Sequence, residues 1–236
     1  MERITAIIVA AGKGLRMGGN IPKQYMELDG IPILARTLLK FEESPADEVI
    51  VVCPQGDVEY VREHIILKYG IKKCTAVVEG GDERFDSCRK GLEAVSPRTG
   101  LVLIHDGVRP LVTPGLIGRV IEYTGKYKAC CPGIVPRDTV RLADSNSFSC
   151  ASPLRNDCRL IQTPQGFEVS LLRTAYERFF AGDEEARREA GITDDAMLVE
   201  RFCGQKIYLC EGEDTNIKLT RPEDPVTARY ILGNLS

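Results

Sequence analysis

Glycines and cationic side chains follow the first apolar run of the chain at a spacing suited to phosphate binding. Residues Val9–Gly18 read VAAGKGLRMG, and Lys23 comes five residues later. Glycines in such a turn let backbone N–H groups approach an anion closely. Arg16 presents a forked donor for phosphate oxygens, and Lys23 presents a compact positive charge. The loop from Ala10 to Lys23 is therefore predicted to hold the phosphates of a nucleoside triphosphate.

Other kinds of phosphate loop fit this segment less well. A dinucleotide-binding fold needs G-x-G-x-x-G at a helix start and an acidic residue after the second strand. Here Gly12, Gly14 and Gly18 have the spacing G-x-G-x-x-x-G, and the second predicted strand ends in Cys53-Pro54. The Gly-Lys-Ser/Thr of a Walker A loop is absent from the segment. The remaining alternative is a glycine-rich turn with solvated cations.

A second glycine-rich segment precedes a predicted helix. Gly80-Gly81 leads into Asp82, Arg84 and Ser87. Small residues at a helix start suit contact with a base or a ribose. Ordinary helix capping by Asp82 is the alternative.

The segment His105–Pro110, with the sequence HDGVRP, directly follows the fourth predicted strand. An acid at the carboxyl end of a strand, beside a phosphate loop, is placed to hold Mg²⁺ or to orient an acceptor. Asp106 is thus our candidate metal ligand, with a simple turn residue as the alternative, and Arg109 is placed for an acceptor phosphate. We interpret His105 as a core histidine whose hydrogen bonds are satisfied.

Later segments carry weaker signals. Thr163 and the Thr193–Ala196 segment each precede a predicted helix, so an N-terminal cap explains both. Lys218 follows Asn216-Ile217 near the end of the chain. Such a lysine could reach a transferred phosphoryl group from the side opposite Lys23, although the sequence alone favours a surface lysine.

The elements that must position these residues alternate along the first half of the chain. Apolar, β-branched runs predict strands at Ile4–Val9, Glu48–Cys53, Cys74–Val78 and Leu101–His105. Helix-period apolar positions predict helices at Ile33–Phe41, Val58–Lys68 and Arg84–Val95. This alternation predicts an α/β, Rossmann-like fold with a mostly parallel sheet and helices on both faces. Ligands of such sheets bind beyond the carboxyl ends of the strands.

The pattern changes after about Pro132, where a projecting β-arm is predicted at about residues 133–157. Polar–apolar alternation at Thr139–Leu142 and Phe148–Cys150 flanks a turn at Asp144–Asn146. An arm with little core of its own usually packs on another chain, so we expect a homodimer. Helical patterns then resume at Val169–Phe180 and Asp195–Cys203, and a strand Lys206–Glu211 and a helix Glu223–Leu232 follow. We expect residues 1–236 to form a single domain.

Composition excludes several classes of partner. The 236 residues are 43% hydrophobic and 28% charged, as in an average globular protein. The formal net charge is −3, so the chain has no excess of positive charge that would attract nucleic acid. The first apolar run is too short for a signal peptide, and no run approaches the roughly 18 apolar residues of a membrane helix. We expect a cytoplasmic protein. Its nine cysteines form no C-x-x-C pair and are interpreted as buried, reduced thiols.

Taken in order, the motifs resemble those of the nucleotidyltransferases, and among them the 2-C-methyl-D-erythritol 4-phosphate cytidylyltransferase family of the non-mevalonate isoprenoid pathway. The resemblance spans nearly the whole chain. It rests on eight ordered segments: Ala10–Gly18, Lys23-Gln24, Gly80–Ser87, His105–Pro110, Arg137-Asp138-Thr139, Thr163-Pro164-Gln165, Ile192–Ala196 and Asn216-Ile217-Lys218.

The resemblance implies CTP and Mg²⁺ as cofactors and a homodimer whose β-arms are exchanged. It implies catalytic roles for Arg16, Lys23 and Lys218. The implied nucleotide-binding residues are Ala10, Ala11, Gly12, Gly14, Gly81 and Ser87. The implied acceptor-binding residues are Asp106, Arg109, Thr163 and, from the arm of the partner chain, Thr139 and Arg155.

Two positions depart from the family pattern and keep alternatives open. Gly107-Val108 stand where the family often has smaller residues, so the valine narrows the acceptor side. The segment Ser152–Asp157 lacks the usual Asp-Arg pair beside Arg155. The related ribitol-5-phosphate cytidylyltransferases therefore remain an alternative. A nucleotide-binding regulator without turnover is the second, and a dehydrogenase, against which the loop spacing argues, is the third.

Overall fold

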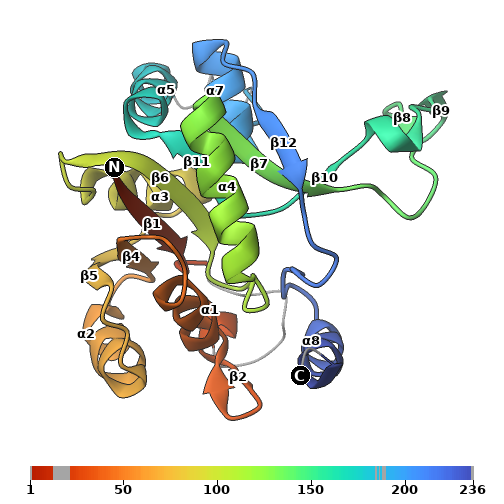
Figure 1. The fold of residues 1–236 in the computed structure, drawn as a ribbon. Helices are drawn as coiled ribbons and strands as arrows, with labels where there is room; N and C mark the ends of the chain where they lie inside the picture. Colours follow the sequence, from red (N-terminus) through yellow and green to blue (C-terminus); the bar gives the residue numbers. More distant parts are fainter. Residues whose placement is uncertain (1, 13–21, 184, 186, 188–189, 235–236) are drawn as a thin grey trace.

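The computed structural model describes residues 2–12, 22–183, 185, 187 and 190–234. Its centre is an eight-stranded sheet in the order β10-β7-β11-β6-β1-β4-β5, with β12 also paired to β7 (Figure 1). The strands of this sheet are β1 Arg3–Val9, β4 Glu48–Cys53, β5 Cys74–Glu79, β6 Thr99–Asp106, β7 Ala129–Ile134, β10 Leu160–Ile161, β11 Gln165–Glu168 and β12 Tyr208–Glu211.

Most neighbouring strands run parallel. β1 pairs with β4 and with β6, β4 with β5, and β12 with β7, all in parallel register. The exceptions are β11, which is antiparallel to both β6 and β7, and β10, which is antiparallel to β7. The predicted mostly parallel sheet is confirmed, and the antiparallel strands were not foreseen.

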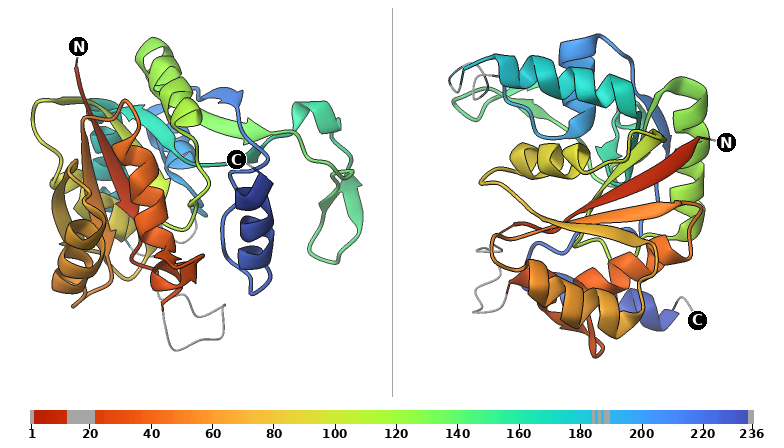
Figure 2. Two further views of the ribbon diagram at one scale, coloured as in Figure 1. Left: turned by 60° about the horizontal axis from the view of Figure 1, so that its bottom comes forward. Right: turned by 90° about the vertical axis from the view of Figure 1, so that its left-hand side faces the viewer.

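Helices cover both faces of the sheet, as predicted (Figure 2). They are α1 Ile33–Glu42, α2 Val58–Val61, α3 Arg84–Glu93, α4 Pro114–Tyr127, α5 Val169–Ala181 and α7 Asp195–Cys203. The last helix, α8 Asp224–Asn234, packs beside β2 instead. Side chains alternate between the two faces of a strand. Ala6 and Ile8 of β1 accordingly join the core beneath α1 and α4, whereas Ile7 joins the core beneath α3, α5 and α7.

Some predicted boundaries change in the structure. The predicted helix at residues 58–68 is α2 continued by a π-helical stretch, Arg62–Leu67. Helix α4 and strands β7 and β11 had no counterpart among the predictions. Thr163 does not cap a helix, because β11 lies between it and α5. Short elements also occur near the first loop: a 3₁₀ turn η2 Lys23–Tyr25 and the strand pair β2 Glu27–Leu28 and β3 Ile31–Pro32.

The predicted arm is present and projects from the body of the molecule (Figure 1). Its tip is an antiparallel pair, β8 Leu142–Ala143 and β9 Ser149–Ala151. The Asp144 carboxylate closes the turn by accepting from the backbone N–H groups of Asn146 and Phe148. Every residue from 141 to 152 is exposed.

The cysteine prediction is only partly correct. All nine cysteines are free thiols, and five are buried: Cys53, Cys88, Cys130, Cys131 and Cys210. Cys150, in β9 of the arm, is exposed. Among the described residues, no helix is long and apolar enough to cross a bilayer.

Candidate active site

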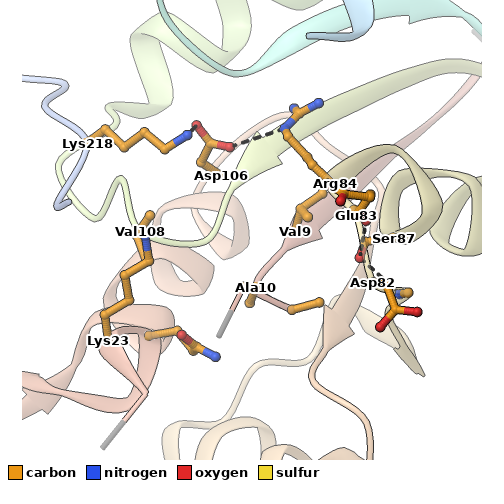
Figure 3. A pocket seen from close by; sticks show the side chains of 14 residues that line it. Val9, Ala10, Lys23, Asp82, Glu83, Arg84, Ser87, Asp106, Val108 and Lys218 are labelled. Atoms are coloured by element: carbon orange, nitrogen blue, oxygen red, sulfur yellow. Dashed lines mark hydrogen bonds and ion pairs between the residues drawn. The ribbon is translucent and has the colours of Figure 1, made fainter. Parts of the chain in front are cut away.

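A cleft opens at the carboxyl ends of β1 and β6, where ligands of parallel sheets bind (Figure 3). Its lining comes from both halves of the sequence: Val9, Ala10, Ala11, Gly12, Lys23, Gln24, Gly81, Asp82, Glu83, Arg84, Ser87, Asp106, Val108 and Lys218. The structure thus brings together most of the predicted site residues.

Asp106 is the electrostatic centre of the cleft. Its Oδ2 lies 3.0 Å from Lys218 Nζ and 3.3 Å from Arg109 Nε, and its Oδ1 lies 3.9 Å from Arg84 Nε. Burial by itself would raise the pKa of this carboxyl, but the charges of Lys218, Arg84 and Arg109 outweigh it and hold the pKa well below its usual range. Asp106 is therefore ionised at neutral pH, and three cations are gathered around it.

Two of these cations differ in their access to a ligand. Lys218 has 39% of its side chain exposed and lines the cleft. The sequence alone favoured a surface lysine without a role in the site, and the structure instead places Lys218 in the site. Arg109 is nearly buried and donates through Nη1 to the Asn216 carbonyl oxygen at 2.7 Å. Arg109 thus underlies the cleft and orients Asp106.

His105 lies fully buried at the end of β6, as the sequence predicted. Its Nδ1 is 3.0 Å from the Thr163 hydroxyl, and its Nε2 is 3.4 Å from the Arg109 carbonyl oxygen. Burial lowers the pKa of the imidazole to about 3, so the ring is neutral at pH 7. Thr163 is also buried, and its hydroxyl accepts from the Asp106 N–H at 3.1 Å.

One wall of the cleft depends on a close approach between two backbones. A Cβ added to Gly80 would overlap the Cβ of Ala11 and approach the Ser87 hydroxyl oxygen to 2.7 Å, so only glycine fits there. The Gly81 N–H donates to this hydroxyl at 3.1 Å. These contacts place Ala10, Ala11 and Gly12 beside Gly81 and Ser87 in one wall of the cleft.

Helix α3 brings Arg84 into the cleft. Glu83, rather than Asp82, caps this helix, in a capping box with Asp86. Arg84 Nη1 donates to the Asp195 carboxylate at 2.7 Å, and Tyr176 donates to the other oxygen at 2.6 Å. Asp194 caps α7 through the Met197 N–H, as predicted for this segment, whereas the neighbouring Asp195 is committed to Arg84.

Lys23 enters the cleft from the 3₁₀ turn η2, whereas Lys218 comes from the segment between β12 and α8 (Figure 3). The turn is anchored by Tyr25, whose hydroxyl donates to the Asp57 carboxylate at 2.8 Å. The next residue, Gln24, is buried and also lines the cleft. Lys23 thus rests on an ordered turn within the described part of the chain.

Other predicted site residues lie elsewhere. Thr139 and Arg155 are exposed residues of the arm and do not line the cleft of their own chain. Arg155 donates to the Arg137 carbonyl oxygen at 3.1 Å. Arg16 and Gly14 lie outside the described residues.

The donor set fits a metal ion that arrives with a triphosphate better than a resident metal. Among the described residues, no group of three or more His, Cys, Asp or Glu side chains could hold an ion. Asp106 supplies one carboxylate at the cleft, and its Oδ1 is the less tightly paired oxygen. Mg²⁺ typically takes one or two carboxylates and completes its shell with phosphate oxygens and water.

Arg84 was not among the predicted site residues, although it lines the cleft. Arg84 stood in the Gly80–Ser87 motif, but its partner Asp195 is 111 residues away along the chain. An arginine on the first turn of a helix after a glycine pair was the available signal. Val108, which departs from the family pattern and was expected to narrow the acceptor side, lines the cleft.

Comparisons with known proteins identify one family, and the matches cover nearly the whole chain. The family model described as 2-C-methyl-D-erythritol 4-phosphate cytidylyltransferase matches residues 4–234. A relative of that name from Lachnoclostridium phytofermentans is 44% identical over 98% of this chain and 97% of its own. Another from Clostridium beijerinckii is 40% identical over 98% of this chain and 99% of its own.

Solved structures extend this similarity to the fold. The 4-diphosphocytidyl-2C-methyl-D-erythritol synthase of Anaerococcus prevotii is 35% identical with a TM-score of 0.85, and the alignment covers 98% of this chain and 96% of that one. The cytidylyltransferase of Thermus thermophilus is 33% identical with a TM-score of 0.73 and covers 98% of both chains. The chain belongs to the 2-C-methyl-D-erythritol 4-phosphate cytidylyltransferase family.

Proposed function

We propose that this chain transfers CMP from CTP to 2-C-methyl-D-erythritol 4-phosphate, releases pyrophosphate, and serves isoprenoid biosynthesis. The observation that carries the proposal is the convergence of Lys23, Lys218 and Arg84 on one cleft from three separate segments of the chain. Family membership supplies the identity of the two substrates.

The chemistry requires such a cluster of charge. A phosphate oxygen of the acceptor attacks the α-phosphorus of CTP in line, and the bond to pyrophosphate breaks. Two polyanions must therefore come together, and negative charge then builds on the leaving group. Lys23 and Lys218 are the catalytic cations that offset this charge within the described residues, and Arg16 of the phosphate loop is the third.

No general base is needed, because the attacking group is already an ionised phosphate. Catalysis then consists of positioning and charge stabilisation. Asp106 remains ionised between its cations and is proposed to accept from hydroxyl groups of the acceptor. Arg109 and Thr163 hold the acceptor end of the site from beneath it.

The nucleotide occupies the wall made by Ala10, Ala11, Gly12, Gly81 and Ser87. We assign Gly81 and Ser87 to the cytosine and ribose, and the phosphate loop, including Gly14, to the triphosphate. Backbone N–H groups near a helix start favour this arrangement because they point at bound anions.

A divalent cation bound with CTP would be held by triphosphate oxygens, water and Asp106 Oδ1. It would neutralise phosphate charge and polarise the phosphorus–oxygen bonds.

The arm is proposed to complete the site in a homodimer. It carries Thr139 and Arg155, which are exposed and do not line the cleft of their own chain. Large apolar side chains are exposed along it and at its base: Leu142, Phe148, Leu154, Leu160 and Ile161. Exposed apolar groups of this size mark protein contacts. A second copy of the chain would cover them and receive Thr139 and Arg155 at its acceptor site.

A turnover assay with two acceptors tests the proposed function. Purified protein is incubated with CTP and Mg²⁺, and pyrophosphate release is measured with 2-C-methyl-D-erythritol 4-phosphate or with ribitol 5-phosphate. The proposal predicts release that depends on the methylerythritol phosphate. Preference for ribitol phosphate would reassign the acceptor. Binding of CTP with no pyrophosphate from either acceptor would indicate a regulator and overturn the proposal.

A further inference from the structure

His105 lies beneath the cleft but does not line it. It is the penultimate residue of β6, and its ring packs against Phe41 of α1 with a centroid separation of 5.0 Å. Both ring nitrogens face polar partners, the Thr163 hydroxyl at Nδ1 and the Arg109 carbonyl at Nε2. Burial alone requires partners for both ring nitrogens, and here both partners belong to segments that build the candidate site.

The partners fix the direction of each hydrogen bond. A carbonyl oxygen only accepts, so the contact with Arg109 requires the proton on Nε2. In the neutral ring Nδ1 is then an acceptor, and the Thr163 hydroxyl must donate to it. The same hydroxyl oxygen accepts from the Asp106 N–H. The four groups form one directed chain, from the Asp106 N–H through Thr163 and His105 to the Arg109 carbonyl.

This chain joins the elements that build the acceptor side. It spans the turn that carries Asp106 and Arg109 and links it to Thr163 before β11. Asn216 joins the same group of residues. Its side-chain Nδ2 donates to the Thr163 backbone carbonyl oxygen, and its backbone carbonyl oxygen accepts from Arg109 Nη1. The segment that carries Lys218 is thereby tied to the same unit.

We propose that His105, as its Nε2–H tautomer, is a positioning residue that fixes Asp106, Arg109 and Thr163 for binding of the acceptor. The proposal rests on the cytidylyltransferase activity proposed above. Its consequence for Thr163 is specific. The hydroxyl proton is committed to His105, so Thr163 has only a lone pair to offer a ligand. It therefore accepts from a hydroxyl of the polyol and does not donate to the acceptor phosphate.

Nitrogen-15 NMR of the wild-type protein tests the tautomer without reference to activity. The chain has two histidines, and His64 is exposed, so it provides an internal reference. Long-range proton–nitrogen correlations at pH 7 distinguish a protonated from an unprotonated ring nitrogen. We expect Nε2 of His105 to be protonated and Nδ1 to be bare. A proton on Nδ1, in either the other tautomer or the imidazolium, would overturn the proposal.

Steady-state kinetics tests the positioning role. His105→Leu removes both hydrogen bonds, and we expect kcat/KM for the acceptor to fall about 10-fold or more, because small misplacements of reacting groups are costly. The KM for CTP should stay within about twofold, since no nucleotide-side residue belongs to the chain of hydrogen bonds. A folded His105→Leu variant with wild-type acceptor kinetics would overturn the proposal.

Thr163 provides a matched pair if His105→Leu does not fold. Thr163→Val keeps the shape but leaves the Asp106 N–H and His105 Nδ1 without partners, and we expect the same selective loss for the acceptor. Thr163→Ser restores the hydroxyl and should recover most of that loss. Equal losses in the two variants would contradict a role for the hydroxyl. His64→Asn is the surface control. A wild-type protein that is inactive with CTP and both acceptors would overturn the proposed function. The NMR experiment does not depend on activity and would still test the tautomer of His105.

Discussion

The cleft and the arm differ in how far their predicted site residues are buried within the chain. In the cleft, Asp106 is only 9% exposed and is held by cations from three separate segments. In the arm, Phe148 is 72% exposed, and the whole stretch 141–152 lies in solvent. The cleft is thus assembled within one chain, whereas the arm leaves its side chains in solvent, where we propose that a second copy of the chain covers them. We propose that residues of the cleft stabilise the reacting phosphates and that residues of the arm complete the acceptor site of a partner chain.

Substitution of the buried partners of Arg84 tests whether contacts within the chain hold the cleft together. Asp195→Ala would leave the Arg84 guanidinium and the Tyr176 hydroxyl without their acceptor. We expect the free energy of unfolding to fall by about 3–5 kcal/mol, as for other broken buried ion pairs. Tyr176→Phe is the matched control, with an expected loss of about 1 kcal/mol. Urea unfolding measures both. A loss of under about 1 kcal/mol for Asp195→Ala would mean that the pair does not hold the cleft together.

Lys23 tests the catalytic role of the cleft. We expect Lys23→Ala to lower kcat at least about 100-fold, as removal of one donor to a transition state typically does. Lys40 in α1 is a suitable control, because it is a partly exposed lysine that lies outside the cleft and pairs with Glu43. Lys40→Ala should leave kcat unchanged in the same pyrophosphate assay. Near wild-type turnover of Lys23→Ala would remove Lys23 from the mechanism.

Deletion of the arm tip tests the other side of the comparison. A variant lacking residues 139–152 should become monomeric in sedimentation equilibrium and lose at least about 10-fold in kcat/KM for the acceptor. Its affinity for CTP should be retained, because the nucleotide wall belongs to the body of the chain. An intact, fully active dimer would show that the arm is not part of the site.

The smallest expected effect is the acid sensitivity that His105 gives to the body of the protein. Burial lowers the pKa of His105 to about 3 in the folded chain, below the value of about 6.5 for a free histidine. The unfolded chain therefore takes up the proton first, and stability is present above pH 6.5 and lost as the pH falls toward 3. Between pH 7 and 6 the loss should be about 0.7 kcal/mol.

Urea unfolding at the two pH values measures this loss. His105→Asn, which has no titrating ring, should show a correspondingly smaller change. The same change in both proteins would show that His105 is not the group responsible.

Features encoded by short, continuous stretches of sequence could be predicted. Apolar runs located β1, β4, β5 and β6, and the parallel topology then predicted that the loop at Ala10 and the turn at Asp106 would meet. The projecting hairpin followed from alternation around a short turn.

Contacts between distant segments could not be predicted in this way. Arg84 begins α3 and Asp195 begins α7, and no local pattern in the sequence predicts that these two residues pair. Thr163 looked like a helix cap because β11 is only four residues long and does not have a continuous apolar pattern. Its partner His105 could be recognised as a core residue, but the direction of its hydrogen bonds needed the fold.

Mixing two inactive variants tests the central claim, that the cleft of one chain is completed by the arm of another. Lys218→Ala damages the cleft and keeps the arm, and Arg155→Ala does the reverse. In a mixed dimer with exchanged arms, one site would have both an intact cleft and an intact arm. Random exchange of equal amounts makes half of the dimers mixed, so about a quarter of the wild-type activity should return. If the arm served its own chain, mixing would restore no activity, and the account would be contradicted.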